Sequence, residues 1–182
     1  MKGTGPASRQ ASRFQEKLSA LASIVRVLKP LYEGAGENIE ARRLIETLIG
    51  AGIWYLPQPS TLWTGKISVA ALSALPNVKL SRDHDVPRKI AAGRLLRLGV
   101  NELTTESLTQ LYLRNLGRFN LVTKEENRKL MPFQRDGVYE STESAYASAG
   151  VELVSGEGHP LLLAAGYGTR ARAASALEGA RL

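Results

Sequence analysis

Hydrophobic residues recur at steps of three and four through the first third of the chain. One set predicts a helix that Pro30 and the segment 34–36 should end; its members are Phe14, Leu18, Leu21, Ile24, Val25, Leu28 and Leu31. A second helix is expected to bury Ile39, Leu44, Ile45, Leu48 and Ile49 before it ends at Gly50 and Gly52. Together the two patterns predict a helical hairpin.

Aromatic residues concentrate in the next segment, residues 54–63, which we expect to form a connection. Trp54, Tyr55 and Trp63 could stack on nucleic-acid bases. However, tryptophans in a small domain usually contribute large buried areas, so we expect these rings to pack the hairpin against the rest of the chain. Residues 66–75 then return to a short helical pattern that stops at Pro76.

Two extended segments follow, separated by helical ones. Residues 78–84 begin with the alternation of a half-buried strand, which Pro87 ends because proline has no backbone N–H. Residues 118–123 are compatible with a second strand. The patterns over 89–98 and 105–116 predict helices between these strands. After the second strand, Thr123 and Glu126 have the spacing of a capping box, so a helix is expected from Lys124 to about Met131. One more turn and a short strand are expected within 145–154.

The amino-acid composition limits the kinds of domain, metal site and binding partner that the chain can have. The chain has 182 residues, 43% hydrophobic and 23% charged, which predicts one main globular domain. It has no cysteine, so disulfides and cysteine-bound zinc are excluded and any metal must be held by oxygen or imidazole. Neither a signal sequence nor a membrane span is indicated, and we expect a cytoplasmic protein. The net charge of +7 favours polyanionic partners, although many soluble proteins are mildly basic.

Three polar segments carry the candidate chemistry. Asp83 and His84 end the first expected strand, Asn120 lies in the second, and Asn127 follows in the capped helix. Carboxylate and amide oxygens suit Mg²⁺ or Mn²⁺, and an imidazole can accept a proton from water near neutral pH. Phosphodiester hydrolysis needs a nucleophilic water, neutralisation of phosphate charge and help for the leaving oxygen, and such groups can supply all three.

This order resembles the HNH, or ββα-metal, endonuclease motif, and its residue types are similar to those in the HNH domains of CRISPR effector nucleases. Two stretches carry the resemblance: Ser-Arg-Asp-His-Asp-Val-Pro-Arg-Lys at 81–89 and Phe-Asn-Leu-Val-Thr-Lys-Glu-Glu-Asn-Arg-Lys-Leu at 119–130. The resemblance implies that His84 is the general base and that Asp83 and Asn127 bind the cation, with Asn120 in support. The long segment between the strands departs from the family and predicts an inserted helical subdomain.

Several alternatives stay open for these residues. Adjacent strand residues point to opposite faces, but at a strand end Asp83 and His84 can still serve one site, as the resembled family implies. Asp85 could replace Asp83, and Glu125 or Glu126 could replace Asn127. Basic residues lie near both stretches and are expected to bind phosphates without reading sequence: Arg82, Arg88, Lys89, Arg94, Arg118, Lys124, Arg128 and Lys129. His159 lies in an expected loop and receives no role. The structural alternative is an ordinary turn that Asp83 caps.

These patterns predict an α+β fold, a mainly helical domain enclosing a small ββα-metal core. The expected divisions are a disordered leader (1–10), an N-terminal helical region (11–76), the core with its helical insertion (77–135), a C-terminal extension (136–165) and a basic tail (166–182). The predicted function is a Mg²⁺- or Mn²⁺-dependent nuclease acting on DNA in preference to RNA. The alternatives are a helical accessory protein of phage or plasmid origin that binds nucleic acid or protein, and an assembly protein that oligomerises through the hairpin.

Overall fold

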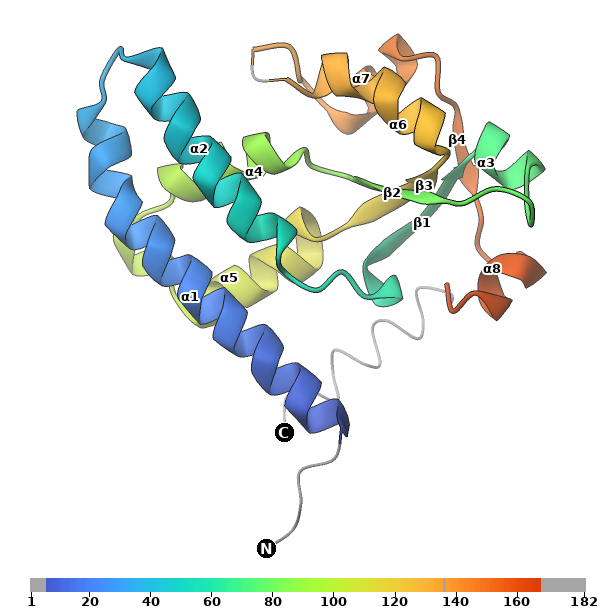
Figure 1. Cartoon of the computed structure of the whole chain (residues 1–182), viewed down its shortest axis with the longest axis horizontal. Coiled ribbons are helices and arrows are strands. Elements are labelled where there is room, and N and C mark those ends of the chain that lie inside the picture. Colours follow the sequence, from blue (N-terminus) through green and yellow to red (C-terminus); the bar gives the residue numbers. More distant parts are fainter. Residues whose placement is uncertain (1–5, 136, 168–182) are drawn as a thin grey trace, which may run out of the picture. The chain divides into compact units, whose positions relative to one another are not determined.

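The computed structural model describes residues 6–135 and 137–167, and in this part of the chain it forms two compact units (Figure 1). Within the described residues, the helical unit consists of residues 6–57 and Arg88–Leu116. The sheet unit consists of Gln58–Pro87 and of residues 117–135 and 137–167. The second half of the helical unit is therefore inserted into the sheet unit. The expected α+β, mainly helical fold is confirmed, and its boundaries differ from the predicted ones.

The helical unit is built on the predicted hairpin, which consists of α1 (Pro6–Gly34) and α2 (Ile39–Trp54). Pro30 does not end α1; the chain turns at Gly36, whose φ of +53° favours glycine. The inserted stretch adds α4 (Arg88–Arg97), the 3₁₀ turn η2 (Val100–Glu102), α5 (Thr105–Leu111) and the π-helical continuation η3 (Tyr112–Leu116). No helix in the described ranges is both long enough and apolar enough to cross a membrane.

Only part of the predicted hairpin core is buried. Leu18, Leu21, Val25, Ile45 and Ile49 are buried, whereas five of the other predicted positions are between 46% and 62% exposed: Ile24, Leu31, Ile39, Leu44 and Leu48. The reason is that α4 and α5 contact the hairpin within this unit, while both hairpin helices carry apolar residues on a second side. Helical spacing alone does not say which of two apolar sides will be covered.

The predicted divisions at the two ends of the chain are partly wrong and partly lie outside the described residues. Pro6–Gln10 belong to α1, so the disordered leader is wrong for these residues, and Met1–Gly5 lie outside the described residues. Most of the predicted basic tail, residues 168–182, also lies outside them. The expected extension 136–165 is part of the sheet unit, because it supplies one strand of the sheet.

The sheet unit contains four strands in the order β2-β3-β1-β4. They are β1 (Trp63–Ser68), β2 (Ser81–His84), β3 (Phe119–Val122) and β4 (Leu153–Ser155). β1 runs parallel to β3, whereas β4 is antiparallel to β1 and β2 is antiparallel to β3. The prediction of a connection and then a helix over residues 54–75 is wrong for β1. Five of the six residues of this central strand are buried, on both of its faces, so it lacks the alternation that reveals a strand.

Short helices flank the strands. They are η1 (Ser60–Leu62), α3 (Val69–Ser73), α6 (Lys124–Leu130), η4 (Met131–Gln134), α7 (Thr142–Ser148) and α8 (Pro160–Ala164). A cluster of Val122, Leu130, Tyr146 and Val151 packs α6 and α7 beside one face of the sheet. On the other face, the Trp63 and Phe119 rings lie 5.6 and 6.4 Å from that of Tyr167.

The predicted strand–strand–helix order is present within the sheet unit. β2 and β3 pair directly, with Asp83 opposite Asn120 and His84 opposite Phe119, and α6 begins two residues after β3 ends. The capping box is confirmed. The Thr123 hydroxyl accepts the Glu126 N–H at 3.1 Å, and the Glu126 carboxylate accepts the Thr123 N–H at 2.9 Å. This cap fixes where α6 starts relative to β3.

We expect Thr123→Ala to lower the free energy of unfolding by about 1 kcal/mol, because it removes one side of the capping box. Urea unfolding followed by circular dichroism measures the change. Thr47→Ala is the control, since Thr47 is exposed in the middle of α2 and its hydroxyl donates to the Arg43 carbonyl. Equal effects of the two substitutions would show that the cap has no special contribution.

Candidate functional site

Two of the predicted site residues lie side by side on one face of the sheet. Asp83 on β2 and Asn120 on β3 are paired across the two strands, so their side chains point the same way. Both are buried, with exposed fractions of 5% and 0%. Two polar side chains buried at neighbouring positions require partners, because an unpaired buried polar group costs about 1–3 kcal/mol.

Asp83 receives its hydrogen bonds from two neutral side chains. Gln134 Nε2 donates to both carboxylate oxygens at 3.0 Å, and the Tyr146 hydroxyl donates to Oδ2 at 2.6 Å. Among the described residues Asp83 takes part in no ion pair. Burial raises the pKa of Asp83 above its ordinary value, the hydrogen bonds from Tyr146 and Gln134 oppose this rise, and the charge of Asp85 adds to it.

Asn120 joins this carboxylate to the middle of the sheet. Its Oδ1 accepts from the Thr64 hydroxyl on β1, and its Nδ2 donates to Asp85 Oδ1 and to the Tyr146 hydroxyl, both at 3.4 Å. Burial is also the main reason that the pKa of Tyr146 is raised, and the neighbouring Asp83 adds to this shift. Tyr146 thus stays protonated and remains a donor. We call Asp83, Asp85, Asn120, Tyr146 and Gln134 the polar network.

His84 lies on the other side of the sheet from this network. It is opposite Phe119, the partner next to Asn120 along β3, so its side chain leaves β2 on the opposite face to Asp83. Its Nε2 lies 3.5 Å from Gln58 Nε2, and the residue is half-buried. β2 ends at His84, as expected. The sequence therefore placed Asp83 and His84 correctly at a strand end, and the structure directs the two side chains apart.

Asn127 is half-buried in α6, and its backbone N–H donates to the Thr123 carbonyl. α6 lies against β2, but within the described ranges Asp83 bonds Gln134 and Tyr146 and not Asn127. Its neighbour Glu126 is buried and bonds the Ser68 hydroxyl at 2.6 Å in addition to capping the helix, which gives it a structural role.

The predicted basic residues are divided between the two units. Arg82, Arg118, Lys124, Arg128 and Lys129 belong to the sheet unit, and Arg88, Lys89 and Arg94 to the helical unit. The Arg82 guanidinium lies 5.0 Å from the Phe119 ring centre and donates to the Gln58 carbonyl. Lys129 is 3.6 Å from Glu125, the other acidic alternative to Asn127. Arg88 stacks on Trp54 instead of standing free for phosphate.

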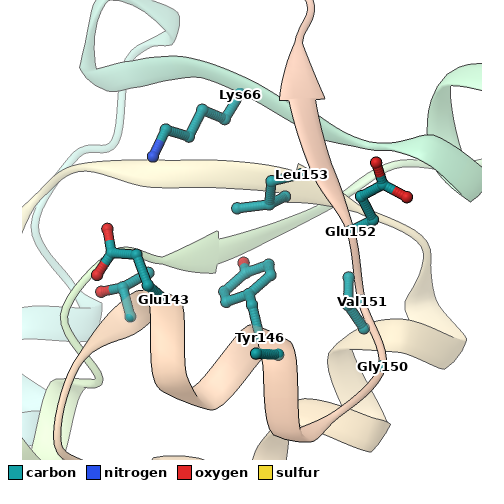
Figure 2. Close-up of a pocket in the computed structure, with 9 residues that line it drawn as sticks. Lys66, Glu143, Tyr146, Gly150, Val151, Glu152 and Leu153 are labelled. Atoms are coloured by element: carbon teal, nitrogen blue, oxygen red, sulfur yellow. The ribbon is translucent and has the colours of Figure 1, made fainter.

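A cavity of about 480 Å³ adjoins the polar network, and Tyr146 contributes to both. Figure 2 shows Glu143 and Tyr146 rising from α7 while Lys66 extends toward them from β1. In the part of the chain that the structure describes, Lys66 is in no ion pair. This cavity could not be predicted from the sequence, because the pattern of β1 does not indicate a strand and Tyr146 lies 63 positions from Asp83.

The network contains two carboxylates, the kind of ligand that hard divalent cations prefer. No three His, Asp or Glu side chains within residues 6–135 and 137–167 are grouped to hold a metal ion, so amide oxygens would have to complete the site. Asp83 and Asp85 supply carboxylates, and Asn127 carries an amide oxygen on α6, which contacts β2; the amide oxygen of Asn120 already accepts from Thr64. Mg²⁺ usually binds one or two carboxylates and keeps several waters. A buried carboxylate without a paired cation is also a group that a cation would stabilise.

Comparison with known proteins identified no relative. No model of a protein family, no curated protein and no solved structure matches the chain.

Replacing Tyr146 with phenylalanine is expected to lower the free energy of unfolding by about 1–3 kcal/mol at pH 8 and by less near pH 4. The hydroxyl stabilises the charged form of Asp83, so its removal raises the pKa of Asp83 further. At low pH Asp83 is protonated and depends less on this bond. Urea unfolding at both pH values measures the difference, with Tyr55→Phe as the control because Tyr55 is exposed. A loss that is independent of pH would contradict this account.

Proposed function

We propose that the protein is a nuclease that hydrolyses phosphodiester bonds in nucleic acid, DNA in preference to RNA, with one divalent cation such as Mg²⁺ or Mn²⁺. One observation carries the proposal: two paired antiparallel strands are followed directly by a capped helix, with Asp83 and His84 at the end of the first strand. Asn127 lies in that helix. This arrangement is the one that the HNH resemblance implies.

Asp83 and Asn127 are the proposed cation ligands, and Asp85 is the carboxylate that could replace Asp83. When bound, the cation neutralises charge on the phosphate and lowers the pKa of water. His84 is the proposed general base that accepts the proton of the attacking water. Because Asp83 and His84 leave β2 on opposite faces, the scissile phosphate would bind at the end of the strand, within reach of both. Asn120 holds Asp85 and Tyr146 in position through its amide.

Cations of the sheet unit supply the affinity for the phosphate backbone in this proposal. Lys66 extends into the cavity beside the network, and Arg82, Lys124 and Arg128 are exposed. Contacts of this kind bind nucleic acid without reading its sequence, and they weaken as salt rises because counterions are released on binding.

The proposal is tested with supercoiled plasmid DNA. We expect nicking in the presence of Mg²⁺ or Mn²⁺, none with excess EDTA, and a decline as salt rises from about 50 to 200 mM. Single-stranded DNA and RNA of matched length are compared in the same assay to establish the substrate. Plasmid that stays supercoiled with either cation, while the protein is folded by circular dichroism, would overturn the nuclease proposal.

One observation favours a second function, binding of nucleic acid without cleavage. Both oxygens of Asp83 already accept hydrogen bonds from Gln134 and Tyr146, so the carboxylate is satisfied without a cation. In this alternative the polar network only stabilises the sheet unit. It predicts salt-sensitive binding of the plasmid that is the same with Mg²⁺ and with EDTA, and no nicking.

A further inference from the structure

Two aromatic side chains at the end of α2 are exposed, in contrast to the expected packing. Trp54 is 60% exposed and Tyr55, the residue that caps the helix, is 72% exposed. Trp63 is buried on β1, so the expectation of packed rings is correct only for that residue. Trp54 and Tyr55 are adjacent on a helix and therefore point about 100° apart around its axis. Two large rings without apolar cover require an explanation.

Trp54 is held in place by an arginine of the helical unit. The Arg88 guanidinium lies 3.9 Å from the centre of the Trp54 ring, which is the geometry of a cation–π contact. The first turn of α4 comes close to α2 at Gly50, where an added Cβ would lie 3.5 Å from the Arg88 carbonyl. Partial burial lowers the pKa of Arg88, but a guanidinium remains charged at neutral pH. A planar cation thus orients an exposed indole.

The surroundings of the two rings are mainly basic. Lys17 Nζ donates to the Tyr55 carbonyl at 3.0 Å, Arg13 lies one turn earlier on α1 and is exposed, and Lys89 follows Arg88. The acidic side chain nearest in sequence on α1, Glu16, accepts a hydrogen bond from Ser12. These basic side chains therefore favour a negatively charged partner over an uncharged, apolar one.

We propose that Trp54, Tyr55 and Arg88, here called the aromatic platform, bind single-stranded nucleic acid by stacking on its bases while the neighbouring cations contact its phosphates. Every unpaired base has an aromatic face, whatever the sequence, and the phosphates complement the positive charges of Arg13, Lys17 and Lys89. Proteins that bind single strands without sequence preference combine these two features. The platform lies wholly in the helical unit, and it does not depend on the proposed nuclease activity.

The test uses fluorescence anisotropy of two labelled 12-mers in EDTA, so that cleavage cannot interfere. One is oligo(dT) and the other has the same length and charge but abasic sites throughout. We expect the full-length protein to bind oligo(dT) at least about tenfold more tightly, since stacking on one base contributes about 1–3 kcal/mol. Trp54→Leu should weaken oligo(dT) binding about tenfold and leave abasic binding unchanged. Tyr55→Leu should give a smaller loss in the same direction.

Two controls separate stacking from charge and from folding. Arg88→Lys keeps the charge but loses the planar contact, so it should weaken oligo(dT) binding severalfold. Leu48→Ala alters an exposed residue of the same helix, 52% exposed, and should leave binding unchanged. Equal binding of the two oligomers, absence of binding, or unchanged oligo(dT) binding by both Trp54→Leu and Tyr55→Leu would each overturn the proposal.

Discussion

Replacing Asp83 with asparagine is expected to lower the rate of cation-dependent cleavage by about 100-fold or more and to make the protein more stable at pH 8. The activity falls because the proposed cation loses its carboxylate ligand, and interactions with developing charge contribute factors of about 10²–10³. The stability rises because the wild-type protein buries a charge without a paired cation, and asparagine avoids this burial. The Gln134 amide can turn its oxygen toward the new NH2 group, so that the pair stays hydrogen-bonded. The expected gain is about 1 kcal/mol, within the range of roughly 0.5–2 kcal/mol for single stabilising substitutions.

The direction of the predicted stability change follows from the pKa of Asp83. Burial raises the pKa of Asp83 in the folded protein above 3.8, its ordinary value, so the folded state holds the proton more tightly than the unfolded state. The wild-type protein therefore loses stability as pH rises from about 3.8 through the raised pKa, and Asp83→Asn removes this loss. The stability difference between variant and wild type should vanish at low pH.

Urea unfolding from pH 4 to 8 and the plasmid assay measure both effects. Glu140→Gln is the control, because Glu140 is an exposed carboxylate of the sheet unit and should change neither. An Asp83→Asn variant that is less stable at pH 8 would show that the carboxylate is a structural group. A variant that keeps wild-type nicking would exclude Asp83 as a cation ligand.

His84→Ala is expected to lower the rate of cleavage by about 10²–10⁴, the usual contribution of a general base, with little change in stability because His84 is half-buried. Single-turnover cleavage with saturating protein measures the rate without the effect of binding. Added imidazole should restore part of the activity, since it can replace the missing base.

His159→Ala is the matched control, as His159 is the other of the two histidines in the chain and lies in the turn before α8. It should cleave like the wild-type protein. If the two alanine variants have the same rate, His84 is not the general base.

The local features of the site could be predicted from the sequence. The end of β2 at His84, the strand at Asn120 and the capping box of Thr123 and Glu126 depend on short stretches of chain, and each is present in the structure. The helical insertion also follows from local patterns, because residues 89–98 and 105–116 have helical spacing.

The features that need contacts between distant residues could not be predicted. β1 carries no alternation because both its faces are covered, and the bonds of Asp83 to Tyr146 and Gln134 span 63 and 51 positions. The sequence predicts only a supporting role for Asn120 and says nothing of its complete burial, which comes from its place beside the central strand. The two apolar sides of the hairpin were indistinguishable until the packing of α4 and α5 was known.

The most direct test of the central claim is the position of a bound cation. Crystals of the protein soaked in Mn²⁺ and measured near the manganese absorption edge would locate the ion by its anomalous signal. The account predicts a peak within about 2.5 Å of an Asp83 oxygen, with the Asn127 amide oxygen also bound, and no such peak in Asp83→Asn crystals. A well-ordered wild-type crystal with no peak beside Asp83 or Asp85 would contradict it.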